Sequence, residues 1–200
     1  MEKKNIVLNV KDFDYFKNKK KTVFFYNYIL DNKQKKIQDV YKLKISKKKL
    51  INYFNKINYY YSEILNKISK NLNYIHGEKK SDRYWSIILG PWIATYLQNM
   101  MSMWIEIEGL NKRKNKFTYN YYQLKQINVP DNYSAYLELS QKIEWRSFVY
   151  SSIIKDFFDK SKFTVKKKYL FSLGNVFNKR KKHFYLPKLN FKFFIFNFFN

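Results

Sequence analysis

One long apolar stripe constrains the fold of this chain more than any other feature. Between residues 50 and 75, apolar side chains recur in steps of three and four: Leu50, Tyr53, Phe54, Ile57, Tyr61, Ile64, Leu65, Ile68, Leu72 and Ile75. This spacing places them on one face of an α-helix, opposite a face of Lys and Asn. Ser46 is a suitable N-cap and Gly77 a suitable stop. We therefore expect a helix at about 46–76 whose stripe faces the core.

A second apolar region follows a short loop and runs from Asp82 to Gly109. It predicts a second long helix at about 82–109. The Gly90-Pro91 pair inside it predicts a kink or a break, because proline lacks an amide donor and disfavours α geometry in the preceding residue. A new helix with Pro91 in its first turn would also satisfy this constraint. The polar interruptions favour a buried helix pair over a membrane span.

The other segments indicate an α/β fold that is predominantly helical. Extended structure is expected at Asn5–Val10 and Thr22–Leu30, where β-branched and aromatic residues gather. An apolar face predicts a further helix at Tyr136–Phe158. The stretch Lys112–Asn132 has no clear period, and we expect it to be mostly loop. Together these elements define an expected α/β domain at residues 1–160.

The remaining residues, 161–200, form a tail rich in Lys and aromatic side chains. Strands are expected in it at Thr164–Leu173 and Phe191–Phe199. The last run is too short to span a bilayer. Because the tail ends on an apolar segment with no closing element, it is typical of a truncated or aberrant chain end.

The net charge of +25 invites a nucleic-acid interpretation. Of the 40 basic residues, however, 36 are Lys and four are Arg, and Asn, Ile, Phe and Tyr are also abundant. That pattern is typical of an A/T-biased genome, in which Lys fills solvated positions by default. A phosphate-binding surface would be expected to contain more Arg, because its fork grips phosphate bidentately. Binding to nucleic acid is therefore the less favoured interpretation.

Several classes of protein are excluded by what the sequence lacks. It contains no cysteine, and its two histidines lie far apart, so it predicts no disulfide and no self-contained metal site. None of the nucleotide-binding, zinc-protease or serine-hydrolase motifs is present. The first 21 residues lack the apolar segment of a secretory signal peptide. We therefore expect a cytoplasmic chain that holds no cofactor of its own.

The candidate site lies where the two long helices are expected to meet. Residues 71–76 read Asn-Leu-Asn-Tyr-Ile-His, and residues 83–92 read Arg-Tyr-Trp-Ser-Ile-Ile-Leu-Gly-Pro-Trp. The segment from Ser81 to Asn111 has no Lys at all, in a chain where Lys is the commonest charged residue. The helix dipole disfavours a cation at a helix start, so Arg83 there suggests a carboxylate partner or an anionic ligand.

Two interpretations of these residues remain open. Asn73, His76 and Arg83 either fix the corner between the helices by hydrogen bonds or face a ligand. In the second case His76 is the candidate catalytic base, and the candidate substrate-binding residues are Arg83, Asn73, Tyr84 and Trp85. Trp85, Trp92 and Trp104 either pack in the core or stack on a sugar. Gly90, Pro91 and Trp92 are expected to have structural roles.

These motifs resemble a family of transferases encoded in bacterial surface-polysaccharide gene regions, including those for lipopolysaccharide and O-antigen. The shared pattern is LN-x-x-H followed by RYW-x-I-x-x-GPW, and the segment Trp145–Tyr150 (WRSFVY) also fits. The resemblance covers roughly residues 5–158 and is specific in 71–109. The early strand departs from it, because Phe24–Tyr28 lacks the Gly, Trp and Cys of the family pattern.

The resemblance implies an α/β, predominantly helical fold, as the incomplete N-terminal half of a two-domain, glycosyltransferase-like (GT-B-like) architecture. It implies group transfer to a sugar-containing acceptor, with a nucleotide-sugar donor held by a missing C-terminal domain. It therefore implies a piece that is inactive alone. An anionic membrane surface is a further expected partner. The alternatives are a basic nucleic-acid-binding module, which would lose affinity steeply with salt, and a non-catalytic remnant.

Overall fold

The computed structural model describes residues 3–8, 12, 22–24, 45–125, 130 and 132–171. The chain divides into two compact units. Among these described residues, the first unit holds those up to residue 24 and those from Ser102 onward, and the second holds residues 45–101. The expected strand at Phe191–Phe199 lies outside the described residues.

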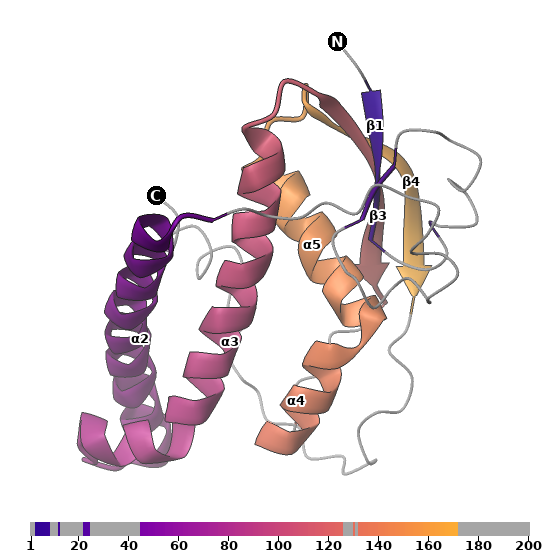
Figure 1. The fold of residues 1–200 in the computed structure, drawn as a ribbon. Helices are drawn as coiled ribbons and strands as arrows, with labels where there is room; N and C mark the ends of the chain where they lie inside the picture. The colour runs from indigo at the N-terminus through magenta and orange to yellow at the C-terminus, as the bar shows by residue number, and fades with distance from the viewer. Residues whose placement is uncertain are drawn as a thin grey trace. The chain divides into compact units, whose positions relative to one another are not determined.

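The first unit is built on a parallel sheet (Figure 1). In the described part of the chain, four strands lie in the order β2-β1-β3-β4, and every neighbouring pair is parallel. Their bounds are Lys3–Val7 for β1, Thr22–Phe24 for β2, Lys116–Leu124 for β3 and Phe163–Phe171 for β4. Strand β4 lies beyond the domain limit expected at residue 160, yet it pairs along the whole length of β3.

The prediction of a loop at residues 112–132 was wrong, because β3 occupies its centre. β3 is buried on both faces along most of its length, as central parallel strands are. Its sequence alternates aromatic and polar residues from Phe117 to Tyr121, and the polar side chains Thr118 and Asn120 are buried as well.

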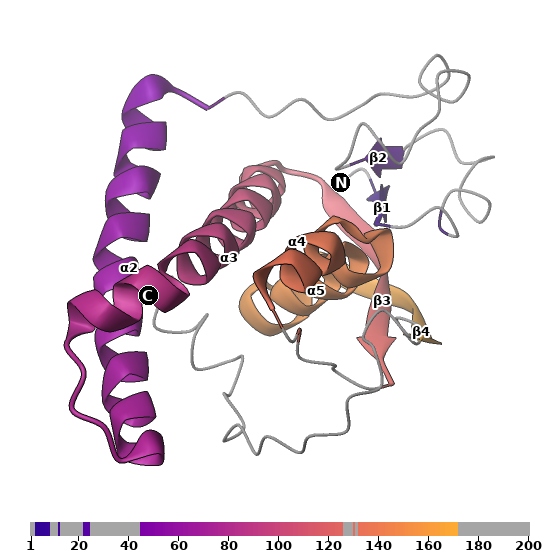
Figure 2. The ribbon, with the colours of Figure 1, turned by 90° about the horizontal axis from the view of Figure 1, so that it is seen from below.

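Two helices replace the single helix expected at Tyr136–Phe158. Helix α4 spans Tyr133–Gln141 and α5 spans Ile143–Phe157, and Lys142 between them has extended backbone angles. Helix α5 contacts β3, and α4 contacts α5 (Figure 2). Hydroxyl groups join α5 to the sheet: Ser147 Oγ donates to the Leu8 carbonyl oxygen at 2.6 Å, and Ser151 Oγ accepts from the Tyr122 amide at 3.1 Å.

The second unit contains α2, Lys47–His76, and the first two thirds of α3, Asp82–Asn111. Both predicted caps of α2 are confirmed: Ser46 Oγ accepts from the Lys49 amide at 3.3 Å, and Gly77 ends the helix in the left-handed conformation at φ 64°. The prediction that the whole apolar stripe is core was wrong. Ile64 and Leu65 are buried, whereas Leu50 and Phe54 are exposed.

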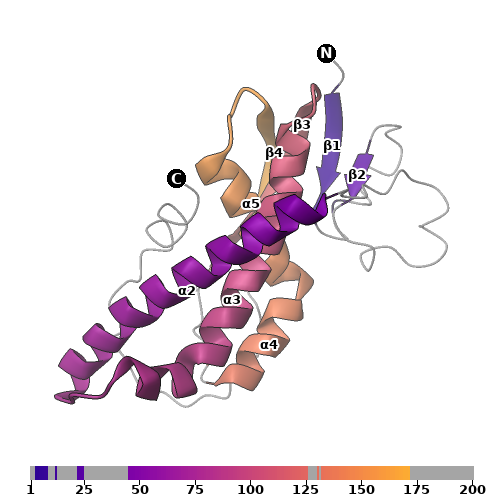
Figure 3. The same ribbon diagram turned by 60° about the vertical axis from the view of Figure 1, so that its left-hand side comes forward.

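Helix α3 continues through Pro91, so neither a break nor a new helix occurs at the Gly90-Pro91 pair. The ribbon of α3 changes direction within its first turns (Figure 3), which agrees with the predicted kink. Its later turns, from Ser102, belong to the first unit, where Met103, Ile107 and Leu110 are fully buried.

Gly90 of α3 leaves room for the Tyr61 side chain of α2. A Cβ atom at this position would lie 2.7 Å from the Tyr61 hydroxyl oxygen. We expect Gly90→Ala to be less favourable in the wild type than in a Tyr61→Phe protein by about 1 kcal/mol, because only the wild type has the hydroxyl that the new Cβ would meet. In both backgrounds the better helix propensity of alanine is opposed by the Pro91 ring, which disfavours α geometry in the preceding residue. Urea unfolding of the two single variants and the double variant measures the coupling. An equal effect in both backgrounds would contradict the steric role of Gly90.

Candidate functional site

Asn73 fixes the corner between α2 and α3. Its Oδ1 atom accepts hydrogen bonds from the Lys80 amide at 3.1 Å and from Trp85 Nε1 at 2.9 Å. Its Nδ2 atom donates to the Lys80 carbonyl oxygen at 2.8 Å. One amide side chain thus ties the end of α2, the connecting loop and the first turn of α3 together. These contacts support the corner-fixing interpretation for Asn73 itself.

Ser81 caps the start of α3. Ser81 Oγ accepts from the Tyr84 amide at 3.3 Å, and Asp82 places a carboxylate in the first turn, where the helix dipole favours it. The Asp82 carboxylate also accepts from Asn66 Nδ2 at 3.1 Å, so a second hydrogen bond joins the two helices. The direction in which α3 leaves the corner is therefore held at two places.

Aromatic rings line the same corner. Trp85 is buried, and the His76 ring stacks on it with 6.4 Å between centroids and 27° between planes. Tyr84 meets the edge of Trp85 at 5.1 Å and is itself exposed. Lys80 Nζ lies 5.6 Å from the centre of the Tyr84 ring. The corner therefore presents an aromatic surface that is supported from beneath by a buried indole.

Arg83 lies on the first turn of α3 and is exposed, as is His76. Within residues 45–125, no ion pair or hydrogen bond is formed by the Arg83 guanidinium, and nothing joins it to Asn73 or His76. Of the predicted site residues, the structure brings Asn73, His76, Tyr84 and Trp85 into one cluster. It places Arg83 on the same first turn of α3 as Tyr84 and Trp85, with its side chain exposed to solvent.

A buried polar cluster that the sequence analysis missed lies in the first unit. Asp12 is fully buried, and its carboxylate accepts from the Leu8 amide at 2.8 Å and from Asn120 Nδ2 and the Tyr122 hydroxyl, each at 2.5 Å. Burial and the negative charge of Asp12 raise the pKa of Tyr122, so its hydroxyl stays a donor. In the described ranges, Thr118 Oγ1 and Asn120 Oδ1 are buried without hydrogen-bond partners.

The position of this cluster in the sheet is informative. The chain leaves β1 for β2 on one side, and it leaves β3 for β4 on the other. Asp12 follows β1 and contacts the carboxyl-terminal half of β3, so the cluster lies where the strand order reverses. Open α/β sheets bind ligands outside the carboxyl ends of the strands, at the point where the strand order reverses. The unpartnered Asn120 Oδ1 can accept a hydrogen bond from a water or a ligand hydroxyl.

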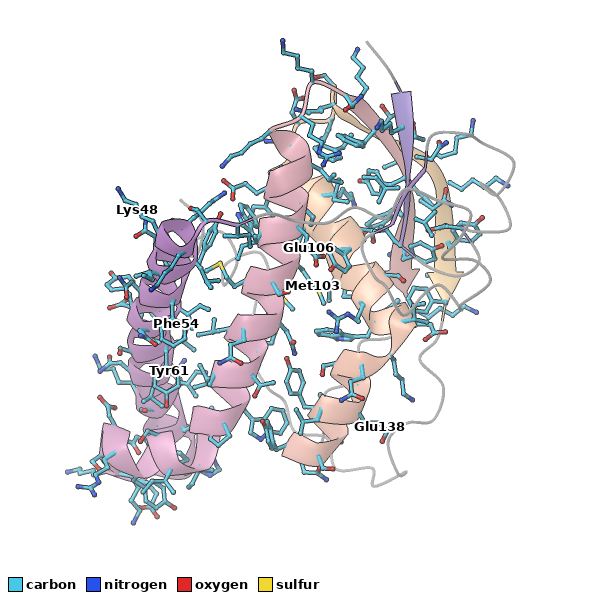
Figure 4. The ribbon with its side chains drawn as sticks, in the orientation of Figure 1. Lys48, Phe54, Tyr61, Met103, Glu106 and Glu138 are labelled. Carbon is cyan, nitrogen blue, oxygen red and sulfur yellow. The ribbon has the colours of Figure 1, made fainter. Side chains whose placement is uncertain are left out.

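A second missed pair is formed by Glu106 of α3 and Tyr150 of α5, both in the first unit. The Tyr150 hydroxyl donates to Glu106 Oε2. Burial raises the pKa of Glu106 to about 7, although the hydrogen bond from Tyr150 opposes this shift. Such a carboxyl group can take up or release a proton near neutral pH, which is the property that acid–base chemistry requires. Figure 4 shows Glu106 on the later turns of α3.

The described residues lack the features of two other kinds of site. In those ranges no three His, Cys, Asp or Glu side chains gather in a way that could hold a metal ion. Likewise, among the helices that the structure describes, none has both the length and the apolar content to cross a bilayer.

Comparison with known families identifies the class of this protein. The family model described as LIC12162 family transferase matches residues 9–199, which is nearly the whole chain. The chain therefore belongs to the LIC12162 transferase family. No curated protein and no solved structure matches it.

Proposed function

We propose that this chain contributes the acceptor-binding part of a transferase that acts on a sugar-containing acceptor in surface-carbohydrate biosynthesis. The observation that carries the proposal is the α2–α3 corner, where exposed Arg83 and Tyr84 stand on a hydrogen-bonded frame. Sugars are bound by aromatic faces, and their carboxylate or phosphate groups by guanidinium. Membership of a transferase family supports group transfer as the reaction class.

In this proposal the residues of the corner have separate roles. Arg83 would bind an anionic group of the acceptor, and Tyr84 would pack against a sugar ring. His76, exposed and stacked on Trp85, would accept a proton from the acceptor hydroxyl. Asn73 would position Trp85 and the loop. The nucleotide-sugar donor would bind to a later domain, as the resemblance to longer family members implies.

Binding of small anionic sugars tests the role of Arg83. We expect glucuronic acid or glucose 1-phosphate to bind the wild-type chain and neutral glucose to bind more weakly. Arg83→Ala should lower the affinity for the anionic sugars about 10- to 100-fold, because a hydrogen-bonded charge is lost. NMR titration measures the affinity, and circular dichroism checks the fold.

Lys79→Ala is the matched control, because it removes an exposed positive charge from the neighbouring loop. It should leave sugar affinity within about 2-fold, as expected for a solvated charge that does not contact the sugar. Equal losses in both variants would show a general charge effect. Unchanged affinity in Arg83→Ala would remove Arg83 from the site.

A further inference from the structure

The first half of α2 exposes apolar side chains that a folded helix normally covers. Leu50 is 55% exposed, Ile51 50% and Phe54 57%. Leu50 and Phe54 lie one turn apart on the same face, and Ile51 lies beside them. Further along the helix, the same apolar pattern is buried at Ile64 and Leu65. We call Leu50, Ile51 and Phe54 the apolar ridge.

Positive charge surrounds this ridge. Lys47 and Lys48 are exposed, and each precedes Ile51 by three or four residues, so they lie beside it on the helix surface. Lys48 and Phe54 are labelled on α2 in Figure 4. From residue 46 to residue 62 the sequence has four Lys and no Asp or Glu. The first half of α2 therefore carries positive charge and no carboxylate of its own.

We propose that the first half of α2 binds an anionic membrane surface, with the apolar ridge in the outer acyl region and Lys47 and Lys48 at the phosphates. Helices that lie in a membrane interface combine Lys with Leu, Ile or Phe, and a Lys side chain beside apolar residues can extend its charged end to the headgroups. Anionic headgroups attract each Lys close to the surface. This inference goes beyond the proposed transfer reaction, because it assigns a docking surface rather than a substrate.

Two other partners fit the surface less well. A nucleic-acid backbone would pair with Lys47 and Lys48, but it offers nothing apolar for Leu50 and Ile51. A protein partner would cover the ridge, but the cores of protein interfaces are depleted of Lys. A bilayer with anionic lipid satisfies both the charge and the apolar surface at once.

Co-sedimentation of the full chain with vesicles tests the proposal. We expect binding to vesicles that contain phosphatidylglycerol and little binding to phosphatidylcholine alone. Lys47→Gln with Lys48→Gln should lower the apparent partition coefficient about 20-fold. Leu50→Ser with Phe54→Ser should lower it by about 10-fold or more and make the remaining binding fully sensitive to salt.

Because the whole chain is basic, matched controls are needed. Lys166→Gln with Lys168→Gln removes the same charge from exposed positions on β4. Val165→Ser with Leu170→Ser removes exposed apolar groups there, which are 37% and 58% exposed. Each control pair should change partitioning less than about 3-fold. Circular dichroism checks that every variant is folded.

The outcomes separate the alternatives. Equal losses in the α2 and β4 pairs would overturn the proposal in favour of general charge attraction. No binding to phosphatidylglycerol vesicles at low salt would overturn it outright. The proposal would also be overturned if the chain did not bind vesicles but associated with itself, and if Leu50→Ser with Phe54→Ser abolished that self-association. Arg83→Ala should keep wild-type partitioning, so a failure of the sugar-binding proposal leaves this one independently tested.

Discussion

Replacing Asp12 by alanine is expected to lower the free energy of unfolding by about 3–5 kcal/mol. The carboxylate accepts from a backbone amide, an Asn side chain and a Tyr hydroxyl, and all of these groups are buried. Alanine leaves each donor without an acceptor and without access to water. Because small domains are stable by only about 5–15 kcal/mol, the variant should unfold at much lower urea concentration.

A graded series identifies the hydrogen bonds as the cause. Tyr122→Phe removes one donor and keeps the carboxylate, so we expect a smaller loss of about 1.5–3 kcal/mol. The double variant should lose less than the sum of the two single losses, because both remove the same contact.

Glu138→Ala serves as the control for the Asp12 series. Glu138 lies on α4 (Figure 4), pairs with Lys142 at 3.5 Å and is largely exposed. Its replacement should change stability by less than about 0.5 kcal/mol. If Asp12→Ala cost no more than this control, the cluster would not be what joins the residues after β1 to β3.

The helices of this fold could be predicted from sequence because their signals are local. The apolar spacing of α2, its Ser46 cap and its Gly77 stop all lie within the helix or next to it. The exposure of Leu50 and Phe54 could not be predicted in this way. An apolar stripe indicates which face of a helix can be buried, but it does not show which element packs against that face. At Pro91 the sequence left a kink and a break as alternatives, and only the kink occurs, because tertiary packing can keep a helix continuous through a proline that disfavours it locally.

The sheet depends on contacts that the sequence does not display. Asn120 of β3 binds Asp12 across 108 positions of chain, and no local pattern shows that this polar side chain is buried. At the candidate site, Asn73 and Trp85 are only 12 positions apart, and the motif did indicate their corner. Glu106 and Tyr150 are 44 positions apart, and nothing in either segment pointed to the other.

Replacing Glu106 by glutamine is expected to change how stability depends on pH. Folding raises the pKa of this carboxyl group to about 7 from an ordinary value of 4.5. Between these two values the folded chain holds a proton that the unfolded chain has released, so stability falls as pH rises. The full shift corresponds to about 3 kcal/mol. Partial solvent access to Glu106 lowers this free energy, and we expect a change in stability of about 2–3 kcal/mol.

Glutamine does not titrate, keeps the side-chain volume and can still accept the hydrogen bond from Tyr150. The variant and the wild type should therefore be similarly stable at about pH 4, where Glu106 is largely protonated in both the folded and the unfolded state. By about pH 8 the variant should be the more stable by about 2–3 kcal/mol. Urea unfolding across this pH range measures the difference, with Glu138→Gln as an exposed control that should show no such trend. A difference that stays constant with pH would mean that Glu106 ionises in the folded protein as it does in the unfolded chain.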